Sequence, residues 1–261
     1  MAKRKKKKTA RSGPWKVFLY TLIIGNVFLL GYFGYVWMKE RYAAGIRYKA
    51  FGIPIPGSYS IHGIDVSKYQ DFIDWESVQE MEVEQIKIGF AFMKATEGVG
   101  NKDALFKRNW KKAKEAGITR GAYHFFISSK SGRMQAENFI KTVKLESGDL
   151  PPVLDIEQTN GTPPAKIRER ALEFLKIVEN YYGVTPVIYT NVDFYKQYLK
   201  EDFDRYPLWV AHYLRKEGPR IQRDWHFWQH SETGSVNGIG SKVDFNVFSG
   251  DSAAFRKLLV P

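Results

Sequence analysis

Short apolar runs alternate with longer amphipathic stretches from Ile61 onward, and this alternation limits the fold more than any other feature of the chain. The first five apolar runs predict strands at residues 63–67, 86–95, 120–126, 152–156 and 185–189. Stretches with helical spacing follow them, at residues 75–81, 106–116, 133–143, 164–182 and 194–199. Strands separated by helices of this length are expected to be parallel, with the helices as crossovers.

The last third of the chain changes character. Strand-like runs follow one another at residues 208–213, 225–229 and 243–247, and the last two leave too little sequence between them for a good helix. An α/β chain that begins with strand–helix units and ends with bare strands fits an irregular, TIM-like barrel better than an open doubly wound sheet.

An uncharged stretch of 21 residues, 17–37, precedes this region. A helix needs ~20 apolar residues to cross the hydrocarbon core of a membrane. Aromatic residues toward its ends and the dense Lys/Arg run before it predict a transmembrane signal anchor over residues 17–38, with the N-terminus in the cytoplasm. A cleaved signal peptide is the alternative, but its apolar region is usually ~7 to 15 residues long. A buried globular helix is disfavoured because the stretch is apolar on every face.

The predicted order is therefore a basic cytoplasmic segment at residues 1–16, the anchor, a juxtamembrane linker with several Gly and Pro at residues 39–60, and a globular domain at residues 61–261. This order describes a single-pass membrane protein. Its globular domain is expected outside the cytoplasm, in the periplasm or on the cell-wall side.

The composition of the chain excludes several classes of function. Of the formal net charge of +12, eight positive charges lie before residue 17 with no acid among them, which leaves +4 for the rest of the chain. No nucleic-acid partner is expected for so mildly basic a domain. The absence of cysteine excludes disulfides, thiol catalysis and cysteine-based zinc sites. The five histidines form no close ligand cluster, so no metal and no cofactor are expected.

Two acids, Asp155 and Glu157, stand where the predicted strand at residues 152–156 ends. Side chains at i and i+2 of a strand point to the same face, so both acids are expected to face one site. A separation of ~5 to 7 Å lies in the range that glycosidases use to protonate a leaving oxygen and stabilise an oxocarbenium-like centre. From these residues alone, a turn cap at Asp155 and a solvated Glu157 are an equally good interpretation.

Other polar and aromatic side chains gather at the C-terminal ends of the predicted strands, where barrels of this class build their sites. In chain order they are Asp65, Lys94, Glu97, Tyr123, His124, Tyr189, Asn191, Trp209, Tyr213, Gln229 and Asp244.

Most of these residues lie in six short motifs, namely Gly63-Ile64-Asp65-Val66-Ser67, Lys94-Ala95-Thr96-Glu97-Gly98, Gly121-Ala122-Tyr123-His124-Phe125, Asp155-Ile156-Glu157, Trp228-Gln229 and Val243-Asp244-Phe245-Asn246. In this order, the motifs resemble those of glycoside hydrolase family 25, the Chalaropsis-type lysozymes or N-acetylmuramidases. The resemblance covers about residues 61–260 and leaves the anchor outside. It implies a (β/α)5β3 barrel that acts on the β-1,4 bond between N-acetylmuramic acid and N-acetylglucosamine in peptidoglycan glycan strands.

Three acids, Glu157, Asp155 and Asp65, are the expected catalytic residues. Glu157 is the expected general acid, with a pKa raised by neighbouring anions and an aromatic-walled cleft. The resemblance implies that Asp155 stays ionised and orients the substrate's N-acetyl group as that group attacks the anomeric carbon, in a substrate-assisted, retaining reaction. A nucleophilic Asp155 or an inverting water remains open. For Asp65 and Asp244, the alternative is a turn or cap role.

Substrate binding is expected from Asp244, Glu97, Tyr123, Tyr189, Trp209, Tyr213 and Gln229. A structural ion pair with Lys94 explains Glu97 nearly as well, and aromatic residues in barrel strands are core residues more often than sugar platforms. His124 is expected to be a hydrogen-bonded structural histidine. His230 departs from the family, whose members often carry Tyr after Trp-Gln, so sugar contacts at that rim of the site are open.

These features predict a membrane-anchored lysozyme. A catalytically silent peptidoglycan-binding module is one alternative, and the retention of all three catalytic acids argues against it. A chitinase-type barrel glycosidase is another, but such enzymes carry a ladder of acids before the last one, where this chain has Leu150, Pro151 and Pro152.

Overall fold

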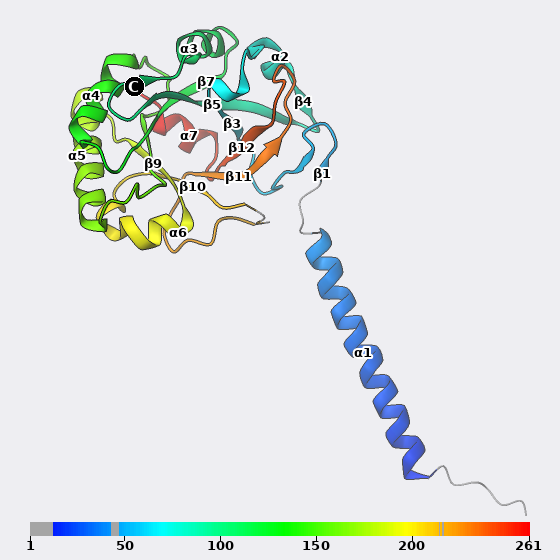
Figure 1. Ribbon diagram of the computed structural model, residues 1–261. Coiled ribbons are helices and arrows are strands. Elements are labelled where there is room, and N and C mark those ends of the chain that lie inside the picture. Colours follow the sequence, from blue (N-terminus) through cyan, green and yellow to red (C-terminus); the bar gives the residue numbers. More distant parts are fainter. Residues whose placement is uncertain (1–12, 43–46, 214, 216) are drawn as a thin grey trace, which may run out of the picture. The chain divides into compact units, whose positions relative to one another are not determined.

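The computed structural model describes residues 13–42, 47–213, 215 and 217–261 (Figure 1). The chain forms two compact units, Met1–Ala44 and Gly45–Pro261. The first unit contains one long helix, α1 (Pro14–Tyr42), and its stretch Phe18–Tyr35 is long and apolar enough to cross a membrane. This stretch coincides with the middle of the expected anchor. Most of the expected basic segment, residues 1–16, lies outside the described residues.

Eight strands of the second unit close into a barrel, as expected. They are β3 (His62–Val66), β5 (Ile86–Glu97), β7 (Thr119–Phe125), β8 (Val153–Asp155), β9 (Val187–Asn191), β10 (Leu208–Ala211), β11 (Phe227–Gly234) and β12 (Val243–Phe248). Neighbours from β5 to β11 pair in parallel and in chain order, and β3 pairs in parallel with β5. β12 closes the ring because it is antiparallel to both β11 and β3.

Helices cover the outside of the strand–helix half of the barrel (Figure 1). They are α2 (Trp75–Glu80), α3 (Phe106–Glu115), α4 (Gly132–Thr142), α5 (Pro164–Tyr182) and the short α6 (Val192–Phe194), which continues as a π-helical turn, Tyr195–Leu199, and a 3-10 turn, Lys200–Phe203. α5 begins with a proline and ends before Gly183, whose φ of 70° is a left-handed value that favours glycine. Between β10 and β12 no helix intervenes in the described residues, as the sequence predicts.

Aromatic side chains fill the interior of the barrel. Phe92 stacks on Trp209 with ring centroids 4.3 Å apart, and Phe90 packs edge-on against both Phe92 and Phe227. A Cβ at Gly63 would lie 2.5 Å from the ring of Phe90, so a glycine on β3 is what admits that ring. The barrel is therefore a solid core, and a site can form only above its ends.

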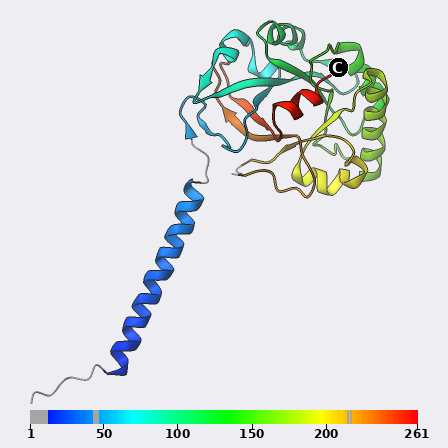
Figure 2. The ribbon, with the colours of Figure 1, turned by 180° about the vertical axis from the view of Figure 1, so that it is seen from behind.

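A further helix, α7 (Ser252–Leu258), closes the barrel at the end where the parallel strands begin (Figure 2). Phe255 of this helix packs against Phe90, Phe227 and Phe248. α7 was not predicted from the sequence. Because one end of the barrel is closed in this way, the opposite end, at the C-termini of the parallel strands, is the one open to a substrate.

The structure also corrects the start of the globular domain, which was expected near residue 61 after a linker at residues 39–60. The strands β1 (Arg47–Tyr48) and β2 (Ile53–Pro54) form an antiparallel hairpin, and Phe51, Ile53 and Ile55 are buried in the outer core of the barrel unit. The second half of the expected linker is thus part of the domain. Two more short strands, β4 (Glu82–Val83) and β6 (Asn101–Lys102), add to the two ends of β5.

Candidate active site

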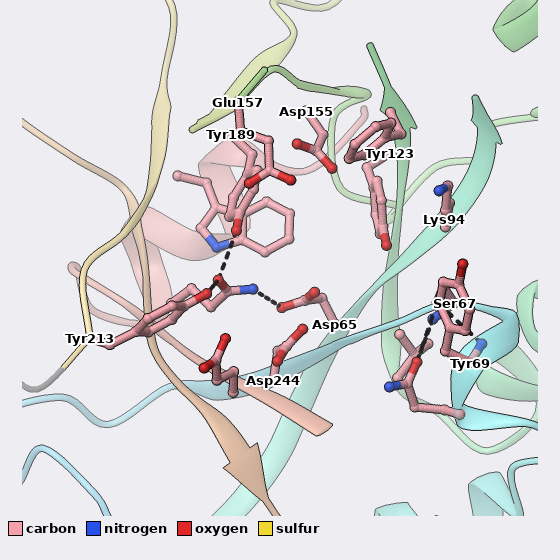
Figure 3. Close-up of a pocket in the computed structure, with 16 residues that line it drawn as sticks. Asp65, Ser67, Tyr69, Lys94, Tyr123, Asp155, Glu157, Tyr189, Tyr213 and Asp244 are labelled. Carbon is pink, nitrogen blue, oxygen red and sulfur yellow. Dashed lines mark hydrogen bonds between the residues drawn. The ribbon is translucent and has the colours of Figure 1, made fainter. Parts of the chain in front are cut away.

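A cleft with a volume of about 360 Å³ lies at the C-terminal ends of the parallel strands (Figure 3). We call it the acidic cleft, because five carboxyl groups and a single cation, Lys94, are among its lining side chains. The carboxyl groups belong to Asp65, Asp155, Glu157, Glu232 and Asp244. Four of them were expected at the site from the sequence, and they come from three different strand ends.

The alternation along β8 brings Asp155 and Glu157 to the same cleft. Val153 belongs to the barrel interior, whereas Leu154 and Ile156 pack in the outer core between barrel and helices. Asp155 is the last residue of the strand, and Glu157 follows two residues later on the same side. The i and i+2 rule therefore holds, although β8 itself is only three residues long.

Burial changes the protonation of both acids. Burial raises the pKa of Asp155 well above its usual range, and the charge of Glu157 adds to this effect. Burial also raises the pKa of Glu157, with a further contribution from the charge of Asp65. The cation Lys94 opposes both shifts. The buried Oδ1 of Asp155 has no hydrogen-bond partner in the described structure, so it can accept one from a ligand.

Asp65 lies across the cleft at the end of β3, within a chain of hydrogen bonds (Figure 3). Its Oδ2 accepts from Gln229 Nε2 and from Asn246 Nδ2, each at 2.8 Å. The Oε1 atom of Gln229 accepts in turn from the hydroxyls of Tyr189, at 2.8 Å, and Tyr213, at 2.6 Å. These donors fix the amide of Gln229 so that its nitrogen faces Asp65.

Asp244 stands beside Asp65 because the two residues are paired across the antiparallel strands β12 and β3. Burial raises the pKa of Asp244 to about 9, and the neighbouring charge of Asp65 adds to the shift. The Asp244 carboxyl donates a hydrogen bond to Asp65, which lowers the pKa of Asp65 against the larger, raising effect of its burial. Asp244 thus holds a proton at neutral pH and presents it to Asp65.

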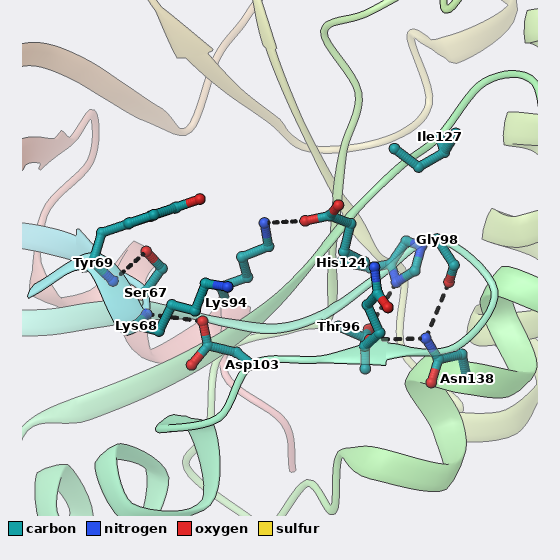
Figure 4. Close-up of polar contacts among 12 residues, drawn as sticks. Ser67, Lys68, Tyr69, Lys94, Thr96, Gly98, Asp103, His124, Ile127 and Asn138 are labelled. Atoms are coloured by element: carbon teal, nitrogen blue, oxygen red, sulfur yellow. Dashed lines mark hydrogen bonds and ion pairs between the residues drawn. The ribbon is translucent and has the colours of Figure 1, made fainter. Parts of the chain in front are cut away.

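Lys94 and Glu97 form an ion pair with a distance of 2.6 Å between Nζ and Oε2 (Figure 4). The Nζ atom of Lys94 also lies 4.5 Å from the ring centre of Phe125, at the wall of the cleft. Glu97 is not among the residues that line the acidic cleft. The expected sugar-binding role of Glu97 therefore has no support in its position, and the alternative of a structural pair with Lys94 describes it.

His124 is buried and hydrogen-bonded at both ring nitrogens (Figure 4). Its Nε2 lies 3.2 Å from Gln135 Oε1, an acceptor only, so Nε2 carries the hydrogen and Nδ1 accepts from the Thr96 hydroxyl at 2.7 Å. Burial lowers the pKa of His124 to about 3. The ring is a neutral structural element that holds β5 against β7, in line with its expected role.

Trp209 differs from its expected role in substrate binding, and His230 does not lie at the rim of the site. Trp209 lines the bottom of the cleft but is 1% exposed, and its ring faces pack on Phe92 and Tyr189. It is a core residue that donates to Asn246 at 2.7 Å, not a platform for a sugar. Trp228 and His230 point to the outside of the barrel and do not line the cleft. The replacement of Tyr by His230 therefore leaves the rim of the cleft unaffected.

Some lining residues were not predicted as site residues. Ser67, Tyr69 and Gln70 follow β3, where the Ser67 side chain accepts from the Tyr69 backbone and Gln70 caps Ser67. The ring of Tyr69 is 75% exposed at the edge of the cleft. Within the described part of the chain, no group of three or more His, Asp or Glu side chains could hold a metal ion.

Comparisons with known proteins agree with this arrangement. The model of the family described as glycosyl hydrolases family 25 matches residues 64–239. The chain is 46% identical over 202 residues to the uncharacterized protein YegX of Escherichia coli K12, which covers 77% of this chain and 74% of that protein. It is 35% identical over 214 residues to lysozyme M1 of Streptomyces globisporus, covering 76% and 71%. The solved bacterial lysozyme of Streptomyces coelicolor superposes with a TM-score of 0.70 and 34% identity, covering 76% and 96%.

The buried Asp244 predicts a stabilising substitution. In the unfolded chain an aspartate releases its proton near pH ~4, whereas the folded chain keeps it until about pH 9, so ionisation favours the unfolded state between these values. Asp244→Asn keeps a donor toward Asp65 and removes this penalty. We expect the melting temperature of the full chain in detergent micelles to rise by about 2 to 4 °C at pH 8 and to be unchanged at about pH 3.

The exposed Asp224 provides the matched control, because Asp224→Asn makes the same chemical change where no ion pair involves the side chain in the described structure. Its melting temperature should equal that of the unmodified chain at both pH values. A lower melting temperature of Asp244→Asn at pH 8 would contradict a protonated Asp244.

Proposed function

Because the chain belongs to glycosyl hydrolase family 25, we propose that it is a lysozyme that hydrolyses the β-1,4 bond between N-acetylmuramic acid and N-acetylglucosamine in peptidoglycan. The observation that carries the proposal is the meeting of Asp155, Glu157 and Asp65 in one cleft above the barrel. Because the family 25 match accounts for the fold and the acids, we no longer consider a chitinase-type glycosidase as an alternative. A membrane-anchored, catalytically active enzyme and a silent binding module predict different outcomes for the substitution of Glu157 described below.

Glu157 acts as the general acid. Of the two acids at the end of β8 it is the less buried, with a half-buried side chain at the opening of the cleft, so it can reach the oxygen of a leaving sugar. Its raised pKa keeps a proton on the carboxyl over a wider pH range than an ordinary glutamate allows. The negative charge of Asp65 across the cleft contributes to the raised pKa of Glu157.

Asp155 receives the N-acetyl group of the sugar whose bond is broken. Burial favours its protonated form, and its Oδ1 lacks a hydrogen-bond partner in the described structure. An amide N–H of the substrate would donate to this carboxyl and stabilise the ionised form, which in turn orients the amide oxygen toward the anomeric carbon. The unpartnered oxygen can accept this N–H, which supports the substrate-assisted, retaining route.

Asp65, Asp244 and Gln229 form the opposite wall of the cleft and bind sugar hydroxyls. Tyr189 and Tyr213 set the orientation of Gln229, while the proton of Asp244 limits the charge on this wall. A wall with fixed donors and acceptors positions the sugar ring without reorganising when the bond breaks.

The helix α1 anchors the enzyme in the cytoplasmic membrane, with the barrel on the outer side where peptidoglycan lies. Its uncharged stretch, residues 17–37, is 21 residues long, against the ~20 needed to span the membrane and the ~7 to 15 typical of the apolar region of a signal peptide. The run of Lys and Arg before residue 17 supports a cytoplasmic N-terminus.

Replacing Glu157 by Gln removes the acidic proton and keeps the size of the side chain. We expect the full chain in detergent micelles to release fragments with reducing-end N-acetylmuramic acid from purified peptidoglycan, and the variant to be at least about 1,000-fold slower. Mass spectrometry of the soluble products gives both results. Equal product from both chains would remove Glu157 from the reaction, and binding to sacculi without products from either chain would favour the silent module.

Replacing Lys94 by Met removes the cation that lowers the pKa of Glu157. The general acid then keeps its proton to higher pH, so the alkaline limb of the kcat/KM profile should move upward, by about 0.5 to 1 pH unit. The control is Glu97→Gln, which leaves the Lys94 charge in place without its partner and should not move the limb upward. A downward shift for Lys94→Met would contradict an acidic role of Glu157.

An uncleaved anchor predicts that the chain remains intact in the cell. Mass spectrometry of the protein purified from membranes should find the residues of α1 in it, and a tag at the C-terminus should be digested by protease added to cells with a permeabilised outer layer. A shorter mass that lacks the residues of α1 would show that the helix is a signal peptide.

A further inference from the structure

A second hollow, with a volume of about 470 Å³, adjoins the acidic cleft. Glu157, Tyr189 and Tyr213 line both, so the two hollows meet at the general acid. We call the second one the basic pocket, because three cations, Lys196, Arg215 and Arg220, are among its lining residues. The side chains that line the site are thus mainly acidic on one side of Glu157 and mainly basic on the other.

Among the described residues, the three cations of the basic pocket have no acidic partner in an ion pair. None of them forms an ion pair with any described carboxyl group, and Asp193, which also lines the pocket, makes none with them. Arg120 of the barrel unit, by contrast, is paired with Asp149. Unpaired cations gathered at a concave surface favour an anionic ligand.

Contacts within the barrel unit hold the basic pocket in place. The backbone N–H of Arg220 donates to His212 Nδ1 at 3.0 Å. The carbonyl of His212 accepts from Trp228 Nε1 at 2.9 Å, which ties this segment to β11. Burial lowers the pKa of His212, and the charges of both arginines add to this, so the imidazole is neutral and serves as a spacer between them.

Lys196 approaches the pocket from the other side. It lies in the π-helical turn that follows α6, and α6 begins directly after Asn191 at the end of β9. The side chain of Asn191 caps α6 by accepting a hydrogen bond from the Phe194 backbone at 2.8 Å. Two separate segments therefore place cations around the same hollow, one after β9 and one after β10.

We infer that the basic pocket binds the carboxylates of a peptidoglycan stem peptide, attached to a muramoyl residue that lies beside Glu157. This inference rests on the proposed lysozyme function. A muramoyl residue differs from its neighbouring sugar by a lactyl group that carries the stem, and the stem carries several carboxylates. Arg and Lys side chains bind carboxylates with charge-assisted hydrogen bonds. The acidic cleft repels such groups, so the stem is directed to the basic side and the glycan is bound in one direction.

The test uses two forms of the same soluble glycan strands, one with intact stem peptides and one in which the stem carboxyls are amidated with carbodiimide and ammonium chloride. Amidation keeps the size of the stem and removes its negative charge. For the full chain in detergent micelles we expect kcat/KM to be roughly 10-fold higher on the intact strands. In the combined variant Lys196→Gln, Arg215→Gln, Arg220→Gln this preference should disappear, with kcat/KM on amidated strands unchanged.

The matched control replaces three exposed lysines away from both hollows, Lys107, Lys144 and Lys257, by Gln. It lowers the net charge by the same amount, so it should keep the preference if the local pocket, and not overall attraction to an anionic polymer, produces it. A third substrate distinguishes the stem carboxylates from the lactyl carboxylate as the bound anion. It consists of glycan strands from which an amidase has removed the stems, so that only the lactyl carboxylate remains. A preference for stripped strands equal to that for intact strands would assign the pocket to the lactyl group and overturn the inference for the stem.

Binding measurements separate this inference from the proposed function. With Glu157→Gln as an inactive background, the dissociation constant for intact fragments should be roughly 10-fold lower than for amidated ones, and equal for both after the three pocket substitutions. Cleavage of both substrates with no preference in either assay overturns the stem-binding role and leaves the lysozyme function in place. Absence of cleavage with a retained, pocket-dependent binding preference overturns the lysozyme function and supports the pocket.

Discussion

The burial of carboxyl groups above a closed aromatic barrel is the constraint on which the rest of this structure depends. Rings such as Phe92 and Trp209 fill the interior, so water cannot reach the acids from below. The same packing that makes the barrel stable therefore desolvates Asp155, Asp65 and Asp244 and raises the pKa of each. The packing of the core therefore favours protonated acids at the site. Lys94 and the amides of Gln229 and Asn246 oppose this by lowering the pKa of the acids that they face.

These acids differ in what surrounds them, and that difference assigns their proposed roles. Asp65 accepts three hydrogen bonds, which favours its ionised form among the buried acids of the site. Asp244 donates one of them and keeps its proton, and Asp155 has an oxygen with no partner. Glu157 stands where the acidic cleft and the basic pocket meet. Hydrogen bonds thus favour the ionised form of Asp65, Asp244 keeps its proton, Asp155 has an oxygen that can accept from a ligand, and Glu157 faces the leaving group.

Much of the barrel could be predicted because each strand is a short apolar run bounded by a helix or a turn. All eight barrel strands and the helices between them lie where the sequence places them, within a few residues. α7 was missed because it buries a single residue, Phe255, whereas the six-residue α2 buries Trp75 and Val78 one turn apart. The hairpin β1–β2 was missed because two-residue strands leave no periodic pattern. A cap signal was present for α7, since Asp251 accepts from the Ala254 backbone, but a single cap residue does not distinguish a helix from a turn.

The acids of the site were predictable for a different reason. They lie at the ends of barrel strands, and these ends lie close together in a barrel regardless of the conformation of the loops. The basic pocket was not, because Lys196, Arg215 and Arg220 lie on a short turn and a loop, where a charged residue is normally solvated. Only the fold shows that β9 and β10 are neighbours and that their following segments share one hollow with Glu157. In a polymer of alternating neutral and anionic sugars, such a site can bind the ring of the anionic unit at the acids and the charged substituent of the same unit at the cations. The chemistry and the direction of binding would then be set by adjacent strand ends of the same barrel.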